Sequence, residues 1–129
     1  SGPLMDRIDM QINLSRVEFS ELKTKEKGES SAAIRERVVK ARLVQQERLE
    51  AVGIHCNAQM GRSEVVKYCQ LDAAAQNVME RYFNMLNLSA RSHDRILKVA
   101  RTIADLAGRE NIEAVHLAEA IQLRTSVRP

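Results

Sequence analysis

The sequence predicts an all-α fold: a helical bundle of about five helices, preceded by an extended N-terminal arm with one short strand. Three observations support this expectation. Glycine (5) and proline (2) are scarce among the 129 residues, so turns and strand breakers are few. Apolar residues recur at helical spacing through most of the chain. Serine, aspartate and glycine stand where helices would begin and end.

The N-terminal arm is expected over residues 1–22. Apolar and polar residues alternate in IDMQINL (8–14), which is typical of a half-buried strand. A lone strand cannot satisfy its own edges, so either its sheet partners lie elsewhere or the segment lies extended against helices. A charged linker (23–30) and then the helical domain (31–129) follow.

Each expected helix combines an apolar stripe with a cap or a terminating glycine. The expected spans are about 31–52, 63–70, 73–86, 90–107 and 113–124. The expected N-caps are Ser30 or Ser31, Ser63, Asp72 and Ser89, and the expected terminators are Gly53 and Gly108. Residues expected to face the core include Ile34, Val38, Ala41 and Leu49 in the first helix, Ile96, Ala100 and Ile103 in the fourth, and Val115, Leu117, Ala118 and Ile121 in the last.

Composition excludes several classes of protein. The net charge of +3 permits contact with nucleic acid without implying it, and the few aromatic residues, 3% of the chain, do not form a base-stacking platform. No apolar run approaches the roughly 20 residues of a membrane span, and no signal peptide is visible. Two cysteines without a CxxC spacing favour reduced thiols in a cytoplasmic protein.

Motifs for common chemistry are absent. The chain lacks the phosphate-binding pattern GxxxxGK[ST] and the dinucleotide pattern GxGxxG. No Ser/His/Asp or Cys/His set is spaced as a nucleophile and its base. His55 adjoins Cys56, but without further ligands nearby no metal site is expected. Taken alone, the chain does not resemble a complete enzyme.

The helix beginning in LSARSHDRILK (88–98) is the exception. Arg91 and Arg95 lie in its first turns, where the helix dipole disfavours cations, and they are four residues apart, so they repel each other. Two interpretations follow. Either these arginines face solvent or pair with a distant carboxylate, or they receive an anion such as phosphate. The residues alone do not decide between them. The other charges of this helix are expected to pair at four-residue spacing, as Asp94–Lys98 and Arg101–Asp105.

Three segments carry a resemblance to a known family. PLMDRIDMQINL, GESSAAIRERVVKAR, and LSARSHDRILKVARTIADLAG followed by IEAVHLAEAIQLR resemble, in order, the C-terminal lid region of the magnesium-chelatase-like AAA+ ATPases, the ComM/YifB competence-protein group. SARSHDRILKVARTIADL is the most specific part. The segment after the strand, SRVEF, lacks a proline expected in this group, which leaves the path of the linker in doubt.

The resemblance assigns roles to arginines. It places Arg7 at the arginine finger, which reaches a neighbouring subunit's nucleotide, and Arg91 at the sensor-2 position of the lid. Arg95 has no family role and is a weaker candidate for contacting ATP phosphates. The resemblance also implies ATP and Mg²⁺ in the full-length protein, neither of them bound to this part alone. It further implies an upstream ATPase α/β subdomain, of which residues 1–22 would be the end, and a homo-oligomeric ring.

Three functions remain open at this point. The resemblance favours a DNA-acting motor that promotes branch migration during recombination in natural transformation. A second interpretation is the ATPase subunit of a magnesium chelatase. A third is a non-enzymatic helical module that binds DNA through its basic helix, or that binds protein. It predicts salt-sensitive DNA affinity for the chain alone.

Overall fold

The computed structural model describes residues 2–24 and 26–125. Its bundle consists of α3 (Ser31–Leu49), α4 (Arg62–Tyr68), α5 (Ala73–Met85), α6 (Ala90–Leu106) and α7 (Ala114–Arg124). Within the described part of the chain there is no sheet, only an isolated parallel bridge between Leu71 and Ile112. The predicted all-α class and the predicted bundle are therefore confirmed.

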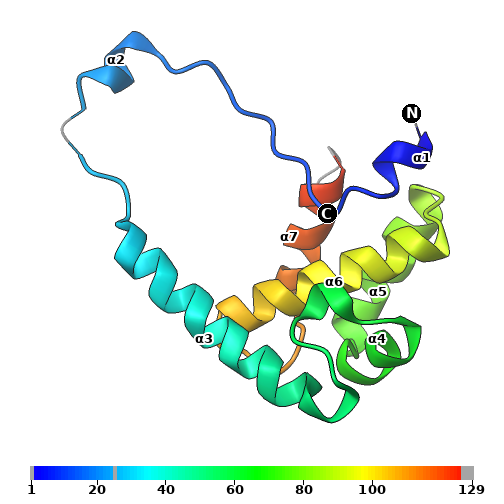
Figure 1. The fold of residues 1–129 in the computed structure, drawn as a ribbon. Helices are drawn as coiled ribbons and strands as arrows, with labels where there is room; N and C mark the ends of the chain where they lie inside the picture. The colour runs from blue at the N-terminus through cyan, green and yellow to red at the C-terminus, as the bar shows by residue number, and fades with distance from the viewer. Residues whose placement is uncertain (1, 25, 126–129) are drawn as a thin grey trace.

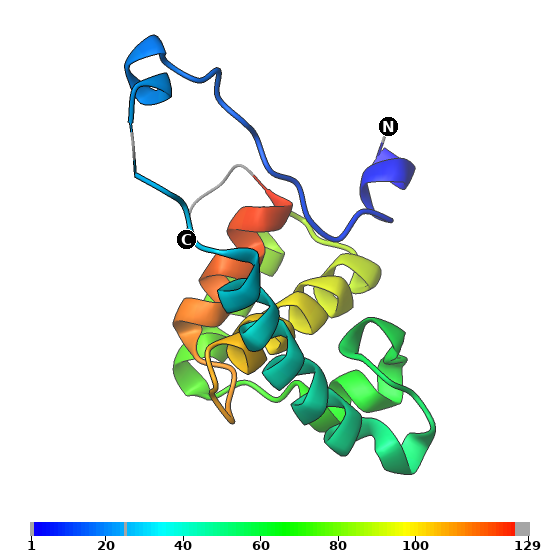
Figure 2. The ribbon, with the colours of Figure 1, turned by 60° about the vertical axis from the view of Figure 1, so that its left-hand side comes forward.

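The bundle is built around α6, which crosses its middle (Figures 1 and 2). Helix α6 packs against α7, α3 and α4, and α5 packs against α7. Aliphatic side chains fill the core, as the low aromatic content predicts. Its largest fully buried members are Leu49, Val65, Met79, Ile96, Ile112, Leu117 and Ile121.

Side-chain caps fix three of the helix starts as predicted. Ser30 accepts a hydrogen bond from the Ala33 backbone, Asp72 from Ala75, and Ser89 from Ser92. These bonds satisfy amide groups that have no partner inside the helix.

The predicted terminators also have the geometry that glycine favours. Gly53 and Gly108 have φ values of 73° and 69°, in the left-handed region. The predicted cap at Ser63 is wrong, because α4 begins one residue earlier with Gly61 as its N-cap. There Glu64 Oε1 accepts from the Gly61 backbone N–H (3.1 Å).

Three predicted core positions are also wrong. Val115 is 67% exposed, whereas Leu117 and Ile121 on the same helix are fully buried. In α3, Ile34 and Val38 are exposed while Ala41 and Leu49 are buried. Both exposed residues lie in the first half of α3, whose start extends past the bundle (Figure 1).

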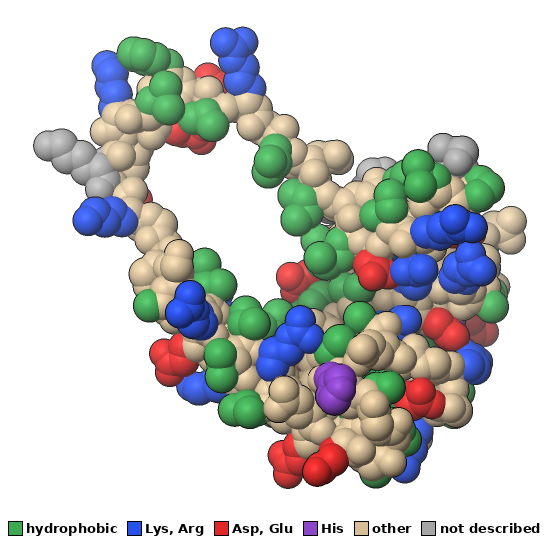
Figure 3. Space-filling view, in the orientation of Figure 1, with side chains coloured by type: hydrophobic (Ala, Val, Ile, Leu, Met, Phe, Trp, Pro, Cys, Tyr) green, Lys and Arg blue, Asp and Glu red, His purple; other side chains and the backbone are tan. Residues whose placement is uncertain are grey.

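The arm differs from the expectation in one respect. It holds the short helices α1 (Gly2–Met5) and α2 (Phe19–Leu22), but no strand forms over residues 8–14. A strand needs a hydrogen-bonded neighbour, and the described residues contain no other strand. Apolar side chains of the arm, such as Leu14 and Phe19, are consequently exposed, and the arm stands away from α3 as an open loop (Figure 3).

Candidate functional site

The candidate site lies at the start of α6. Ser89 caps this helix, and Arg91 follows in its first turn with an exposed side chain. Among the described residues, no carboxylate forms an ion pair with Arg91. The backbone amides and Arg91 together place positive charge at one end of the helix, which suits an incoming anion.

Arg95 is paired, unlike Arg91. Its Nη1 donates to Asp9 Oδ1 at 2.6 Å, across 86 residues of sequence. Its side chain is only 26% exposed. Its Nε is buried and has no hydrogen-bond partner within the described residues. Of the two interpretations left open for this residue, the structure shows the distant carboxylate. A phosphate would have to displace Asp9 to bind the Nη1 edge of Arg95.

Asp9 belongs to a segment that docks on the bundle through Arg124, the last residue of α7. Arg124 Nη2 donates to the carbonyl oxygens of Asp6 (3.2 Å) and Met5 (3.4 Å), and Nη1 donates to that of Ile8. Nη2 also donates to Ser92 Oγ at 3.0 Å, and Ser92 Oγ donates to Asp6 Oδ1 at 3.3 Å. Burial lowers the pKa of Arg124, while the Asp6 carboxylate acts in the opposite direction.

Arg7 lies inside this docked segment and is itself exposed. Its backbone is held locally by a hydrogen bond from its N–H to the Leu4 carbonyl (3.0 Å). The docking brings the Arg7 segment against Ser92, the residue next to Arg91. Sequence reasoning chose Arg7 and Arg91 separately, and the structure attaches their two segments to each other.

Sequence reasoning did not predict a second cluster of charged residues, which surrounds Asp105. Asp105 has no exposed side-chain surface and accepts from Arg48 through both oxygens, at 2.6 and 2.9 Å. It also accepts from Arg101 Nε (3.2 Å) and from Asn57 Nδ2 (2.9 Å). The sequence predicted only the Arg101–Asp105 pair. Arg101 and Asp105 follow the buried Leu97 at four-residue steps, which could have indicated an inward-facing pair.

This buried network is structural. Arg101 donates its remaining hydrogen bonds to the carbonyls of Arg109 and Glu110, at 2.9 and 2.8 Å, which fixes the chain between α6 and α7. Burial lowers the pKa of Arg101, against the opposing effect of Asp105. Nearby, burial raises the pKa of the Cys69 thiol to about 12, so this cysteine is a neutral core residue rather than a nucleophile.

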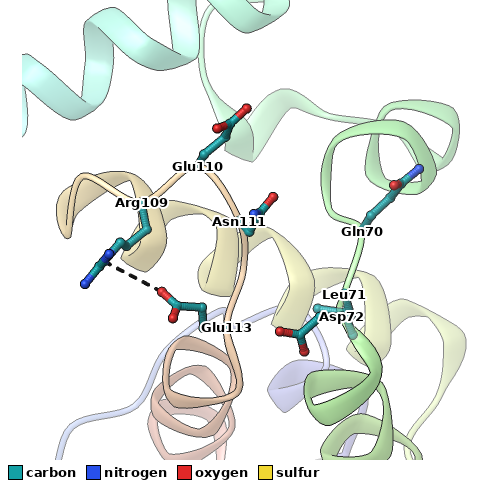
Figure 4. A pocket seen from close by; sticks show the side chains of 7 residues that line it. All are labelled: Gln70, Leu71, Asp72, Arg109, Glu110, Asn111 and Glu113. Atoms are coloured by element: carbon teal, nitrogen blue, oxygen red, sulfur yellow. Dashed lines mark ion pairs between the residues drawn. The ribbon is translucent and has the colours of Figure 1, made fainter.

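A surface hollow of about 580 Å³ lies elsewhere, beside the bridge between Leu71 and Ile112. Figure 4 shows its lining, in which Arg109 turns towards Glu113 with Nε and Oε2 3.7 Å apart. Asp72 and Glu110 add further negative charge, so the hollow does not suit a phosphate. Its lining includes none of the three candidate arginines.

The basic residues of α6 do not form an open basic face. Lys98 points at the carbonyls of Ala58 and Met60 (both 3.4 Å), and the predicted Asp94–Lys98 pair does not appear among the described ion pairs. Asp94 instead pairs with Arg62. Since Arg95 and Arg101 also have partners within the fold, little charge is left for a DNA-binding helix. This observation weakens the interpretation of a stand-alone DNA-binding module.

None of the helices in the described residues combines the length and apolar character needed to cross a bilayer. No three histidine, cysteine or acidic residues lie close enough there to hold a metal ion.

Comparison with known proteins gives a consistent result. Residues 28–124 match the family described as "Magnesium chelatase, subunit ChlI C-terminal". Competence protein ComM of Haemophilus influenzae is 41% identical over 129 residues, which cover 99% of this chain and 25% of ComM. The uncharacterized protein YifB of Escherichia coli is 37% identical over 125 residues, which cover 96% of this chain and 24% of YifB.

A more distant relative, an uncharacterized protein of Mycobacterium tuberculosis, is 32% identical over 124 residues, or 96% of this chain and 24% of the relative. The expected resemblance to the ComM/YifB group is thus confirmed. The chain spans about a quarter of the length of these relatives.

Proposed function

Because the chain belongs to the family of magnesium chelatase subunit ChlI C-terminal regions, we propose that it is the helical lid of an AAA+ ATPase and supplies arginines to ATP phosphates. Arg91 is the sensor-2 arginine and Arg7 the arginine finger. The observation that carries the proposal is the position of Arg91. It is an exposed guanidinium in the first turn of a capped helix, with no carboxylate paired to it in the described residues.

The physical reason lies in the charge balance at this helix end. A cation near a helix N-terminus is disfavoured by about 0.3–1 kcal/mol, and a bound phosphate reverses that sign. Each charge-assisted hydrogen bond to an arginine then contributes about 1.5–3 kcal/mol. Arginine suits this role because its planar fork binds two phosphate oxygens at once.

Arg95 takes a lesser part in this proposal. Its Nη1 is bound to Asp9, so contact with a phosphate would first cost that ion pair. Its Nε is buried without a hydrogen-bond partner among the described residues. Arg95 is therefore a weaker phosphate contact than Arg91.

The residues at the start of α6 fit a nucleotide phosphate, because they offer donors and no unpaired acid. ATP with Mg²⁺ would supply the phosphoryl group, and its main binding loop would belong to an upstream ATPase subdomain. In this chain Arg91 binds and orients phosphate oxygens, and Arg7 reaches towards a neighbouring subunit. Positioned arginines of this kind contribute about 10³–10⁵ to the rate of phosphoryl transfer.

The whole protein is proposed to be a cytoplasmic, ring-forming motor that acts on DNA. The name of ComM, a competence protein that shares 41% of its residues over this region, supports DNA as the partner. The family description favours a second candidate, the ATPase subunit of a magnesium chelatase. DNA stimulation of the ATPase supports the motor, and stimulation only by a porphyrin-bearing protein supports the chelatase.

The test of the phosphate role is Arg91→Ala in the full-length protein. Loss of this guanidinium should leave nucleotide binding within about threefold of wild type while lowering ATP turnover by about 10² or more. Arg81→Ala, which removes another exposed arginine from α5, is the matched control and should change neither quantity. Turnover as high in Arg91→Ala as in Arg81→Ala would refute the sensor-2 role.

A further inference from the structure

Arg124 makes an unusual set of contacts for a residue at the end of a helix. Its guanidinium is buried, with the residue only 8% exposed, and it donates to acceptors on two separate segments. Three acceptors are the backbone carbonyls of Met5, Asp6 and Ile8, and the fourth is Ser92 Oγ in the first turn of α6. One side chain therefore connects the end of α7, the start of α6 and the arm.

The bound carbonyls lie on both sides of Arg7. Those of Asp6 and Ile8 immediately flank it, so Arg124 fixes the backbone of Arg7 without contacting its side chain. Farther along the arm, the Gln11 backbone N–H donates to the Leu123 carbonyl, which extends the attachment to α7. The Arg7 side chain stays exposed, as a residue that reaches a partner must be.

We propose that Arg124 is a positioning residue that fastens residues 5–8 to the start of α6, so that Arg7 and Arg91 are carried as one unit. The catalytic consequence rests on the proposed function of these two arginines. The attachment itself does not depend on those roles: it rests on the contacts of Arg124, with the Arg95–Asp9 ion pair and the Gln11–Leu123 hydrogen bond beside them. When the lid rotates, an arm fastened in this way moves with it, and the guanidinium of Arg7 changes position together with that of Arg91.

Arginine is the side chain that this arrangement requires. Three of the four acceptors lie around Nη2, whose two N–H groups they share, and Nη1 binds the fourth, so the contacts use the two NH₂ groups that the planar guanidinium fork presents side by side. Glutamine at this position could reach at most two of the four acceptors. The backbone carbonyls around Arg7 would then lose the one side-chain donor that the described part of the bundle gives them.

Arg101 offers a matched control for a purely structural role. It is also buried, at 4% exposed, and it also donates to two backbone carbonyls, those of Arg109 and Glu110. Those carbonyls belong to the connection between α6 and α7, and Arg101 does not contact the arm. Arg101→Gln should therefore destabilise the bundle as Arg124→Gln does, without releasing Arg7.

The first experiment uses hydrogen exchange of the full-length protein. Arg124→Gln should lower protection in peptides covering residues 5–11, where Arg7, Ile8 and Gln11 amides are hydrogen-bonded, while peptides from α5 stay protected. Arg101→Gln should leave residues 5–11 protected. Equal protection of these residues in wild type and Arg124→Gln would overturn the proposal, whatever the ATP turnover of the variant.

The second experiment measures ATP turnover of the same proteins. Arg124→Gln should lower kcat about tenfold or more with KM changed less than about twofold, whereas Arg101→Gln should keep kcat within about twofold. Adding Arg124→Gln to Arg7→Ala should lower kcat no further, because the positioned group is already absent. Losses that multiply in the double variant would contradict action through Arg7.

The two experiments separate the two ideas. If Arg7→Ala hydrolyses ATP at the wild-type rate, the finger role in the proposed function fails, and hydrogen exchange alone decides whether Arg124 holds the arm. If Arg7→Ala is slow but Arg124→Gln matches Arg101→Gln in kcat, the positioning role fails and the finger role stands.

Discussion

Replacing Asp105 by asparagine should unfold the bundle more readily than any surface change. Asp105 accepts four hydrogen bonds on two buried oxygens, two from Arg48, one from Arg101 and one from Asn57. Asparagine keeps one oxygen and places an NH₂ group where the other accepted. Two of the N–H donors then face an NH₂ group instead of an oxygen, and the guanidinium groups of the buried Arg101 and the half-buried Arg48 lose their counter-charge.

The size of the effect follows from these contacts. Two lost hydrogen bonds to charged or buried donors contribute about 1.5–3 kcal/mol each, and removing one partner of a buried ion pair costs about 3–5 kcal/mol. Arg101 keeps its two carbonyl acceptors and Arg48 keeps Asn57 Oδ1 (3.1 Å), so the lower end applies. We expect the free energy of unfolding to fall by about 3 kcal/mol, a large part of the 5–15 kcal/mol typical of a domain.

Urea denaturation of this chain, followed by circular dichroism, measures the loss. Arg62→Gln is the control, since it breaks the exposed Arg62–Asp94 pair and should change the free energy of unfolding by no more than about 0.5 kcal/mol. A loss below about 1 kcal/mol for Asp105→Asn would show that the network does not hold α3 to α6 as the contacts indicate.

Two further predictions concern the fold. The pKa of Cys69 is raised from 9.0 to about 12 because burial disfavours the thiolate, so the folded state holds the proton more tightly than the unfolded state. The stability that this thiol contributes is therefore complete below pH 9.0 and falls as the pH rises towards 12. Over this pH window the urea midpoint of Cys69→Ala should fall less steeply than that of the wild type. An equal slope in the two proteins would contradict the raised pKa of Cys69. Ser89→Ala removes the N-cap of α6, whose hydroxyl oxygen accepts a hydrogen bond from the Ser92 backbone N–H at 3.1 Å. In the same urea assay it should lower the free energy of unfolding by about 1 kcal/mol. An unchanged free energy would mean that water satisfies the Ser92 N–H equally well.

The helices could be predicted because their signals are local. A stripe of apolar residues, a capping serine and a terminating glycine all act within a few residues of one another, so both ends of α6 and the start of α3 follow from nearby sequence. The expected end of the first helix was three residues too late, because α3 stops at Leu49 and a 3-10 turn over Glu50–Val52 leads to Gly53. The prediction of a strand over 8–14 failed because its signal is local as well. A segment with alternating residues forms a strand only when another strand lies beside it, and the alternation says nothing about whether such a neighbour exists.

The contacts of the candidate site could not be predicted, because they join distant parts of the sequence. Asp9 and Arg95 are separated by 86 residues, and Arg124 and Ile8 by 116. Local charge rules treated Arg95 and Arg91 as equals. They also assigned Asp94 to Lys98, although the fold offers Asp94 the guanidinium of Arg62 instead.

The fold thereby separates two arginines that the sequence left equivalent. Mutual repulsion and the helix dipole act on both, but Asp9 neutralises Arg95 at 2.6 Å and leaves Arg91 as the uncompensated charge. Because Asp9 neutralises Arg95, Arg95 repels Arg91 less, and the free-energy cost of an exposed Arg91 at the helix start is lower even without an anion. Since Asp9 is fastened to the bundle by the same docked segment that contains Arg7, the arm stabilises the helix end at which Arg91 is exposed. An anion arriving there would meet one available guanidinium rather than two, which is why the phosphate role is assigned to Arg91.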